Sequence, residues 1–415
     1  MNALRWGIFG LLLGVATGMV AQPGPIIAPE HPFINHAANR IVMKGSPDSW
    51  LNYHRKLDQL VFDGKGQINV VHFGGSHVQA DMWTMELRQR LQTLVPGIRS
   101  GRGLIFPYKM ARTNNPHWYE PMYTGNWTAV RNVAQADSSV LGVTGISVTT
   151  RDTASELKVH FRGEAYPGYT FDRVRVLHRM DSSFEVHAWS IDSTMRITRK
   201  VNEAQGYTEF VFDRYADTLR LRFLRTDTVQ QRQFTLRGIL LDSPDPGVIV
   251  HSCGVNGAST RSWLRCQDMP RELALLTPDL VILSIGINDA HDPDFAPSVY
   301  EANYRELIRR IRSVAPDAAI LLTTNTDSFM KRKYPNRNAS SIRDVMLRLS
   351  ASENVAVWDT YGVMGGEGSI KLWERAGLAQ RDRIHLKREG YVLLGDLLFT
   401  ALTETYGTYL RTSDH

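Results

Sequence analysis

The sequence has 415 residues, which suits two domains of ordinary size or one large domain with an insertion. Hydrophobic residues make up 43% and charged residues 22%, a balance typical of a globular protein rather than a disordered chain. The formal net charge is +6, but no dense tract of lysine and arginine accompanies it, so nucleic acid is a poor candidate partner.

Residues 1–21 have the pattern of a secretory signal peptide. A single cation, Arg5, precedes an apolar stretch from Trp6 to Val20, and Ala21 is a suitable last residue before cleavage. The stretch is about 15 residues long, which is short for a bilayer span, although an uncleaved anchor is the alternative. We therefore expect an exported protein, periplasmic or extracellular, without a membrane span after cleavage. Such a basic protein favours anionic envelope polymers as partners.

Residues 22–110 and 247–415 share an α/β pattern. In the first segment, the strand-forming run "INVVHFGG" leads into the helical run "DMWTMELRQRLQTLV". In the second, helical runs alternate with the strand-forming runs "GVIVHSCG", "PDLVILSIGIND", "AAILLTTNT" and "NVAVWDT", and a last helical run follows "RIHL". Strands that alternate with helices predict a doubly wound parallel sheet.

Residues 111–246 differ, because apolar residues alternate here with period two. The runs "LKVHFRG", "FDRVRVLHRM", "FEVHAWS" and "LRLRFLR" each place apolar side chains on one face, and turn residues separate them. This pattern predicts the short antiparallel strands of a β-sandwich. The predicted fold class is therefore α/β, with an all-β sandwich inserted into a parallel-sheet domain.

Three strand ends of the α/β pattern carry residues suited to acyl chemistry. In an open parallel sheet, ligands bind beyond the carboxyl ends of the strands. Ser76 ends the first strand in "FGGSH", Gly254 ends the second in "CGVNGAS", and Asn288 follows the third in "GIND". A serine hydroxyl is a candidate nucleophile, and backbone or asparagine N–H groups are candidate donors to an oxyanion. Taken singly, each residue is more simply explained by a structural turn.

A fourth motif, "DRIHL", places Asp382 three residues before His385. Such a turn can fold the carboxylate onto one imidazole nitrogen and leave the other nitrogen to accept a serine proton. An ordinary loop aspartate and a helix-capping histidine are the alternative. Of the other histidines, His72 and His251 lie on predicted strands and are expected to be packed, whereas His291 is expected near the cleft.

Together and in this order, the four motifs resemble the four blocks of the SGNH hydrolase superfamily, also called GDSL esterases. The resemblance covers roughly residues 67–95 and 247–410. It implies a flavodoxin-like sheet of about five parallel strands, in agreement with the strand pattern.

The same resemblance implies a role for each residue. Ser76 would be the nucleophile, His385 the general base and then acid, and Asp382 the group that orients the imidazole. The amides of Ser76 and Gly254 and the side chain of Asn288 would form the oxyanion hole.

One departure from the family pattern stands beside the serine. The usual block has aspartate before the serine, whereas this chain has Gly75. That aspartate does not carry the proton, so the chemistry need not be lost. The hydrogen bonds of the loop would then be made by His77, Gln79 or Asp81.

An exported SGNH enzyme with a sandwich between the first and second blocks is similar to the peptidoglycan O-acetylesterases, whose inserted domain is similar to a carbohydrate-binding module. This likeness implies removal of acetyl from the C6 hydroxyl of N-acetylmuramic acid, through an acetyl-serine intermediate and without a cofactor. The partner would be an O-acetylated glycan. The stretch "HWYEPMYTGNW" offers Trp118, Tyr119, Tyr123 and Trp127 for stacking on sugar rings, although packing inside the sandwich is the favoured interpretation.

Other functions stay open at this point. An O-acetyltransferase, or a deacetylase of a plant or capsular polysaccharide, would keep the triad and change the acceptor or the polymer. A non-catalytic glycan-binding protein is a third hypothesis, kept alive by Gly75 and opposed by the intact serine, asparagine, aspartate and histidine.

The two cysteines, Cys253 and Cys266, permit a disulfide but do not require one, and two buried thiols are the alternative. No cluster of histidine, cysteine and carboxylate residues has the spacing of a metal site, so no catalytic metal is predicted.

Overall fold

The computed structural model describes residues 31–412 apart from residues 46–47, 99, 135–140, 163–168, 181, 228, 230 and 231. The predicted signal peptide, residues 1–21, lies outside the described residues. Within the described part of the chain, no helix combines the length and the apolar character needed to cross a bilayer.

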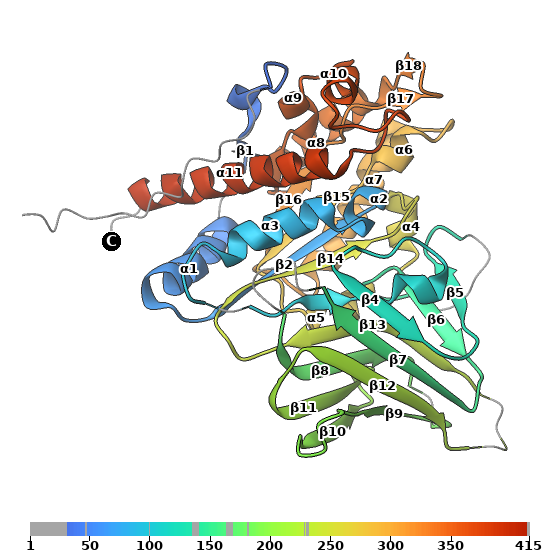
Figure 1. Cartoon of the computed structure of the whole chain (residues 1–415). Helices are drawn as coiled ribbons and strands as arrows, with labels where there is room; N and C mark the ends of the chain where they lie inside the picture. The colour runs from blue at the N-terminus through green and yellow to red at the C-terminus, as the bar shows by residue number, and fades with distance from the viewer. Residues whose placement is uncertain are drawn as a thin grey trace, which may run out of the picture. The chain divides into compact units, whose positions relative to one another are not determined.

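Five parallel strands form the central sheet (Figure 1). Across the sheet they are β14 (Gly247–Gly254), β2 (Gln67–Gly74), β15 (Leu280–Ser284), β16 (Ala319–Thr323) and β19 (Ala356–Trp358). A sixth strand, β1 (Ile41–Met43), pairs antiparallel with β19. Counted along the chain, the parallel strands have the order 2-1-3-4-5 of flavodoxin-like sheets. The predicted flavodoxin-like sheet is thus confirmed.

Helices cover both faces of this sheet. Side chains point alternately to either face along each strand, and these strands are apolar at successive positions, so both faces must be buried. Val71 and Phe73 belong to the core shared with α4 (Thr260–Leu264), α5 (Met269–Ala274), α7 (Pro297–Arg312) and α8 (Asn338–Ser352). His72 points the other way and meets the Trp83 ring edge-on at 4.8 Å. On that side lie α1 (Asp48–Asp63), α3 (Met82–Gln92) and α11 (Arg388–Thr412).

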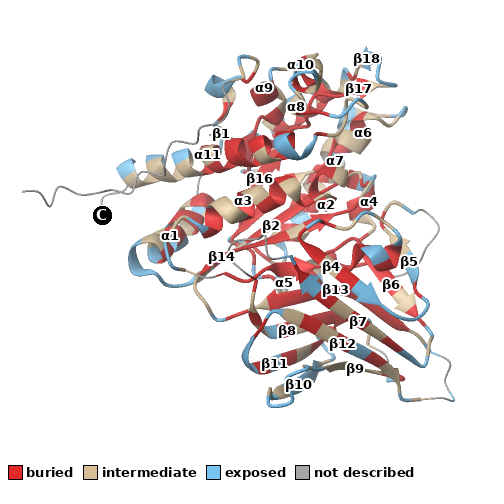
Figure 2. Cartoon of the chain, viewed as in Figure 1, coloured by how far each residue is buried: buried red, intermediate tan, exposed pale blue. Residues whose placement is uncertain are grey.

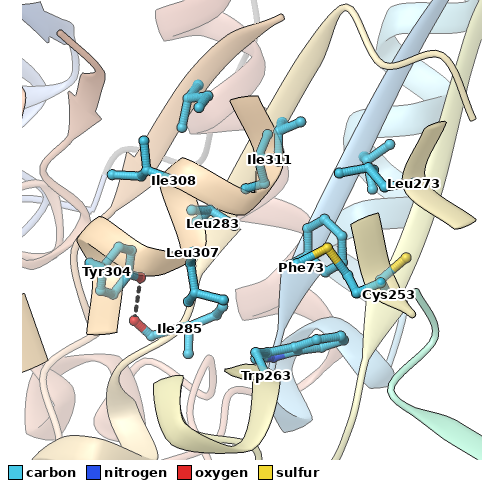
Figure 3. Packing of buried hydrophobic residues seen from close by; sticks show 14 of the residues in the cluster. Phe73, Cys253, Trp263, Leu273, Leu283, Ile285, Tyr304, Leu307, Ile308 and Ile311 are labelled. Atoms are coloured by element: carbon cyan, nitrogen blue, oxygen red, sulfur yellow. Dashed lines mark hydrogen bonds between the residues drawn. The ribbon is translucent and has the colours of Figure 1, made fainter. Parts of the chain in front are cut away.

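The turn after β15 is anchored in the first core, which Figure 3 shows from close by. The hydroxyl groups of Tyr300 and Tyr304 both donate to the Ile285 carbonyl, at 2.8 and 2.6 Å. Gly286 follows with a φ of 153°, and a β-carbon there would lie 2.5 Å from the Tyr300 hydroxyl oxygen. The conformation of the turn that carries Asn288 is therefore set by buried tyrosines and a glycine.

The cysteines also lie in this core. Cys253 and Cys266 are free thiols and both are fully buried. Burial raises the pKa of Cys266 to about 12 and raises that of Cys253 further, so both thiols are neutral. Of the two alternatives left open by the sequence, the structure has the buried thiols.

Several short elements lie near the carboxyl ends of the strands. They are α2 (Ser76–Gln79), α6 (Ile287–Ala290), α9 (Thr360–Met364), α10 (Ser369–Arg375), η1 (His36–Ala38) and a ribbon of β17 (Phe329–Met330) and β18 (Tyr334–Pro335). The first two follow β2 and β15 directly, so they begin at the edge where parallel sheets bind ligands.

Two antiparallel sheets make up the predicted sandwich. The larger contains β3 (Gly103–Ile105), β5 (Thr128–Arg131), β6 (Ile146–Thr150), β8 (Phe171–His178), β10 (Ile197–Asn202), β11 (Tyr207–Ala216) and β13 (Phe234–Asp242). The smaller contains β4 (Tyr119–Tyr123), β7 (Ala154–Phe161), β9 (Phe184–Ala188) and β12 (Thr218–Arg225).

The period-two pattern predicted this arrangement because alternate side chains enter a second core. In β7, Leu157 and Val159 are buried while His160 is exposed, as Figure 2 shows for the strands in general. β3 already pairs with β13, so the chain enters this sheet before residue 111. The domain boundaries at residues 110 and 246 stay a prediction.

Buried polar contacts join the sandwich to the α/β layers. Arg237 of β13 is 5% exposed and contacts Asp268 at 2.5 Å and Glu272 at 3.1 Å, beside and within α5. The Leu104 amide of β3 donates to His251 Nδ1 of β14 at 3.0 Å. These contacts fix how the inserted strands approach the edge strand of the central sheet.

Candidate active site

Ser76 lies where the strand order of the central sheet reverses. β2 has β14 on one side and β15 on its other side, and in open parallel sheets ligands bind beyond the carboxyl ends of the strands at such a position. β2 ends at Gly74, Gly75 precedes the first turn of α2, and Ser76 is the first residue of that turn. The backbone N–H groups at the start of a helix have no partner within it, so they stay available as donors.

Ser76, His385 and Asp382 form one continuous chain of hydrogen bonds. Ser76 Oγ lies 2.9 Å from His385 Nε2, and His385 Nδ1 lies 2.8 Å from Asp382 Oδ2. The other carboxylate oxygen of Asp382 accepts the backbone N–H groups of Ile384 and His385, both at 3.0 Å. The fold thus brings together three predicted residues from opposite ends of the chain.

The carboxylate of Asp382 is held in its ionised form. Burial opposes its charge, but hydrogen bonds from the His385 ring and from the two backbone N–H groups outweigh burial and lower the pKa of Asp382. An ionised carboxylate holds the proton of the imidazole on Nδ1 and leaves Nε2 to accept the serine proton. The His385 and Asp382 side chains are 35% and 29% exposed, so these two members of the hydrogen-bonded triad are open to solvent.

Asn288 lies beside the turn that carries Ser76. Its Nδ2 donates to the Ala258 carbonyl at 2.9 Å and would lie 3.0 Å from a β-carbon on Gly75. An amide nitrogen has two hydrogens, so one remains for an oxyanion.

The next residue, Asp289, accepts the backbone N–H and hydroxyl of Thr260, which ties α6 to α4. Burial raises the pKa of Asp289 to about 6.

Gly254 ends β14, where it pairs with Gly74 of β2. A β-carbon at Gly254 would collide with the backbone of Gln79 in α2, so only glycine allows this approach. Its carbonyl accepts the Tyr108 hydroxyl at 2.9 Å. The contribution of its N–H to an oxyanion hole stays a prediction.

Gln79, one of the three residues expected to make the hydrogen bonds of the loop in place of the usual aspartate, bonds to two other segments of the chain. It is 1% exposed, and its Oε1 accepts the Asn256 backbone N–H at 2.6 Å. Its Nε2 donates to the Thr113 hydroxyl at 3.1 Å and to the Asn114 carbonyl at 2.8 Å. One side chain therefore links the serine turn, the loop after β14 and the segment that leads to β4.

Asp81 is the second polar anchor of this region. Its side chain is fully buried and contacts Arg102 at 2.5 Å and Arg88 at 3.3 Å. Its φ of 53° lies in the left-handed region, which aspartate tolerates better than most residues. Arg88 also donates to the Val250 carbonyl of β14 from two nitrogens, at 3.0 and 2.9 Å. Gln79 and Asp81 thus fasten the serine turn to distant segments, and whether they replace the usual aspartate stays a prediction.

The other predicted residues divide into packed and exposed ones. His72 and His251 are buried and hydrogen-bonded, as expected. The pKa of His291 is lowered mainly by burial and, to a smaller extent, by the charge of His385, so His291 lies near the triad. Among the four aromatic candidates, Trp118, Tyr119 and Trp127 are 7%, 1% and 7% exposed, so the packing interpretation holds for them. Tyr123 is 39% exposed and alone presents a ring to solvent.

No group of three or more His, Cys, Asp or Glu residues in the described ranges has the geometry to hold a metal ion.

Residues 225–393 match the GDSL-like Lipase/Acylhydrolase family. This segment is similar to the acylhydrolases of that family. It contains the predicted glycine, asparagine, aspartate and histidine, whereas Ser76 lies before the matched residues. The resemblance to SGNH hydrolases is confirmed, and a carboxylic ester hydrolase is the class of enzyme that it supports.

One solved structure shares its fold with most of this chain. The structure of a peptidoglycan O-acetylesterase, 20% identical, has a TM-score of 0.70 over 89% of this chain and 99% of that chain. A lipase/acylhydrolase from Enterococcus faecalis, 24% identical, covers 39% of this chain and 77% of its own, with a TM-score of 0.31. An acetylxylan esterase from Geobacillus stearothermophilus, 21% identical, covers 38% and 73%, with a TM-score of 0.31. No curated protein matches.

Proposed function

We propose that this chain is an exported serine esterase that removes O-acetyl groups from peptidoglycan. The observation that carries the proposal is the chain of contacts from Ser76 through His385 to Asp382, at 2.9 and 2.8 Å, beyond the carboxyl end of β2. An acyl-transfer reaction needs a nucleophile, a base in contact with it and a group that orients the base, and this arrangement supplies all three.

In the proposed reaction, Ser76 Oγ attacks the acetyl carbonyl carbon and His385 Nε2 takes the hydroxyl proton. The negative charge on the carbonyl oxygen is stabilised by the Ser76 and Gly254 N–H groups and by Asn288 Nδ2. The bond from the acetyl carbon to the sugar oxygen breaks, and His385 returns its proton to that oxygen. Water then attacks acetyl-Ser76 with His385 as base, which releases acetate and restores the serine.

Three features support a polymeric glycan as the substrate. The triad is open to solvent rather than enclosed, so a chain can lie across it. The similar peptidoglycan O-acetylesterase shares the fold over 89% of this chain, a span too long to leave out the sandwich. The apolar N-terminal stretch, read as a signal peptide, would bring the enzyme to the compartment where peptidoglycan lies.

Acetate release from O-acetylated peptidoglycan tests this proposal. The wild-type protein should release acetate, and Ser76→Ala should lower kcat by about 10³-fold or more. Ser340→Ala is the matched control, because Ser340 is exposed on α8 and its hydroxyl bonds only to the Arg337 carbonyl. Equal rates for Ser76→Ala and wild type would contradict the proposed nucleophile.

The competing substrates are separated by the same assay. If acetylated xylan loses acetate faster than peptidoglycan does, the enzyme is a deacetylase of another polysaccharide. If acetyl passes to an added glycan acceptor rather than to water, it is an O-acetyltransferase. Covalent labelling of Ser76 by a fluorophosphonate would exclude the non-catalytic hypothesis.

A further inference from the structure

A cavity of about 520 Å³ opens on the sandwich at the end of β4 and the turn after β6. None of the residues in its walls takes part in the proposed reaction. The polar and aromatic ones used below are Arg112, Tyr123, Asn126, Arg151, Asp152 and Gln233.

Two arginines give this cavity its chemical character. Neither Arg112 nor Arg151 has an ion-pair partner among the described residues, and both are exposed. Gln233 Oε1 accepts the Arg151 Nε and Nη2 hydrogens at 3.3 and 3.2 Å, which holds the guanidinium in place. A guanidinium that is held in place without an ion-pair partner is suited to bind an anionic ligand.

The one carboxylate in the wall is already engaged. Asp152 Oδ2 accepts the Asn126 backbone N–H at 2.6 Å and its side-chain amide at 3.4 Å. The cavity wall therefore carries two arginines and one carboxylate, which is hydrogen-bonded to a loop, so its charge balance is positive. Tyr123, which is 39% exposed, adds an aromatic side chain to the wall, and an aromatic ring suits the apolar side of a sugar.

The cavity is connected to the serine turn through a short path of contacts. Thr113 directly follows Arg112, and its hydroxyl accepts from Gln79 at 3.1 Å and from Asn256 Nδ2 at 3.3 Å. Gln79 lies in the same short helix as Ser76. A polymer that occupies the cavity therefore lies against the segment that is fastened to the catalytic turn.

We propose that this cavity is a second glycan-binding site and that it takes a unit carrying a carboxylate. The proposal deepens the proposed function, because it rests on a glycan substrate, and names an acidic glycan as the kind that is held. Peptidoglycan meets this requirement through the carboxylates of its stem peptides, whereas an unsubstituted xylan is neutral.

Binding of a glycan that has no acetyl group tests the cavity without using the esterase reaction. The intact protein is titrated with soluble de-O-acetylated peptidoglycan fragments and, separately, with neutral xylo-oligosaccharides. The double variant Arg112→Ala/Arg151→Ala should bind the acidic fragments about 10-fold or more weakly than wild type, with a smaller dependence on salt. Arg55→Ala is the control, because Arg55 is an exposed arginine of α1 that makes no ion pair with the described residues.

The outcomes separate the two proposals. A Kd that is unchanged in the double variant, or no measurable binding to wild type, would overturn the acidic-glycan site. An equal loss for neutral and acidic glycans would also overturn it, since charge would then play no part. A weakened Kd in a protein whose wild type releases no acetate would support the site and contradict the esterase assignment instead.

Discussion

The imidazole ring of His77 stacks on that of His385, with ring centroids 5.4 Å apart and ring planes at 23°. His77 is 7% exposed, and its Nδ1 hydrogen-bonds the Tyr391 hydroxyl of α11 at 3.2 Å. Burial, with a smaller effect of His385 and against the attraction of Asp382, lowers the pKa of His77 to about 3. A ring that stays neutral therefore supports the ring that receives the serine proton.

This stacking predicts that His77 positions the base. His77→Ala should lower kcat for a small acetyl ester about 10-fold or more with little change in KM, because His385 gains freedom to leave the serine. His77→Phe keeps a flat ring against His385 and should recover most of kcat. Steady-state kinetics of both variants provide the measurement. The same kcat loss in both would contradict a role that depends on stacking.

The buried His77 also predicts a pH-dependent difference in stability. Unfolded His77 takes up a proton near pH 6.5, whereas the folded ring does so only near pH 3, so its contribution to stability is lost as pH falls below 6.5. Between pH 7 and pH 5 the wild type should lose about 2 kcal/mol relative to His77→Phe. Urea unfolding of both proteins at the two pH values measures this, and a difference that does not change with pH would contradict it.

Gly75 predicts that the usual aspartate is not tolerated here. A β-carbon would lie 3.0 Å from Asn288 Nδ2 and 3.4 Å from the Ala258 carbonyl, so Gly75→Asp should displace the amide or draw its free hydrogen to the new carboxylate. We expect kcat to fall about 10- to 100-fold. Gly407→Ala is the control, because Gly407 lies on α11 with only Arg411 nearby. A fully active Gly75→Asp would show that the turn has room to adjust.

Gln79 predicts a coupling between the serine turn and two loops. Gln79→Glu keeps the size of the side chain but loses both Nε2 hydrogen bonds and places a charge beside the Asn114 carbonyl. The variant should have a lower kcat and faster amide hydrogen exchange around residues 113–114, whereas the Asn256 N–H keeps its acceptor oxygen. Exchange measured by mass spectrometry checks this. Faster exchange spread evenly over the chain would instead indicate general destabilisation.

The buried Asp81 predicts the largest effect on stability. Asp81→Asn would leave the guanidinium groups of Arg88 and Arg102 buried without a counter-charge, which should lower the free energy of unfolding by about 3–5 kcal/mol. Glu156→Gln, which breaks the exposed pair with Arg222, should have a much smaller effect. Urea denaturation compares the two. Similar losses would mean that the Asp81 cluster is reached by water.

Local patterns in the sequence were enough to predict the elements and the order of the motifs. Period-two alternation in "LKVHFRG" follows from burial of one face of a strand, and a continuous apolar run such as "PDLVILSIGIND" follows from burial of both faces. The motif order likewise indicated Ser76, Asn288 and Asp382-x-x-His385, since the carboxyl ends of parallel strands meet at one edge.

The tertiary structure alone showed how the serine turn is supported. Gln79 contacts residues 113–114, His77 contacts His385, and Asp81 contacts Arg102. A local sequence pattern cannot predict contacts between segments that are far apart in the chain. The same holds for the aromatic stretch before β5: its composition allowed sugar stacking for four rings and favoured packing, and burial decides for packing in three of them and leaves Tyr123 exposed. Residue type and spacing predict what a side chain can do, whereas burial and long-range contacts decide which of those possibilities the folded chain uses.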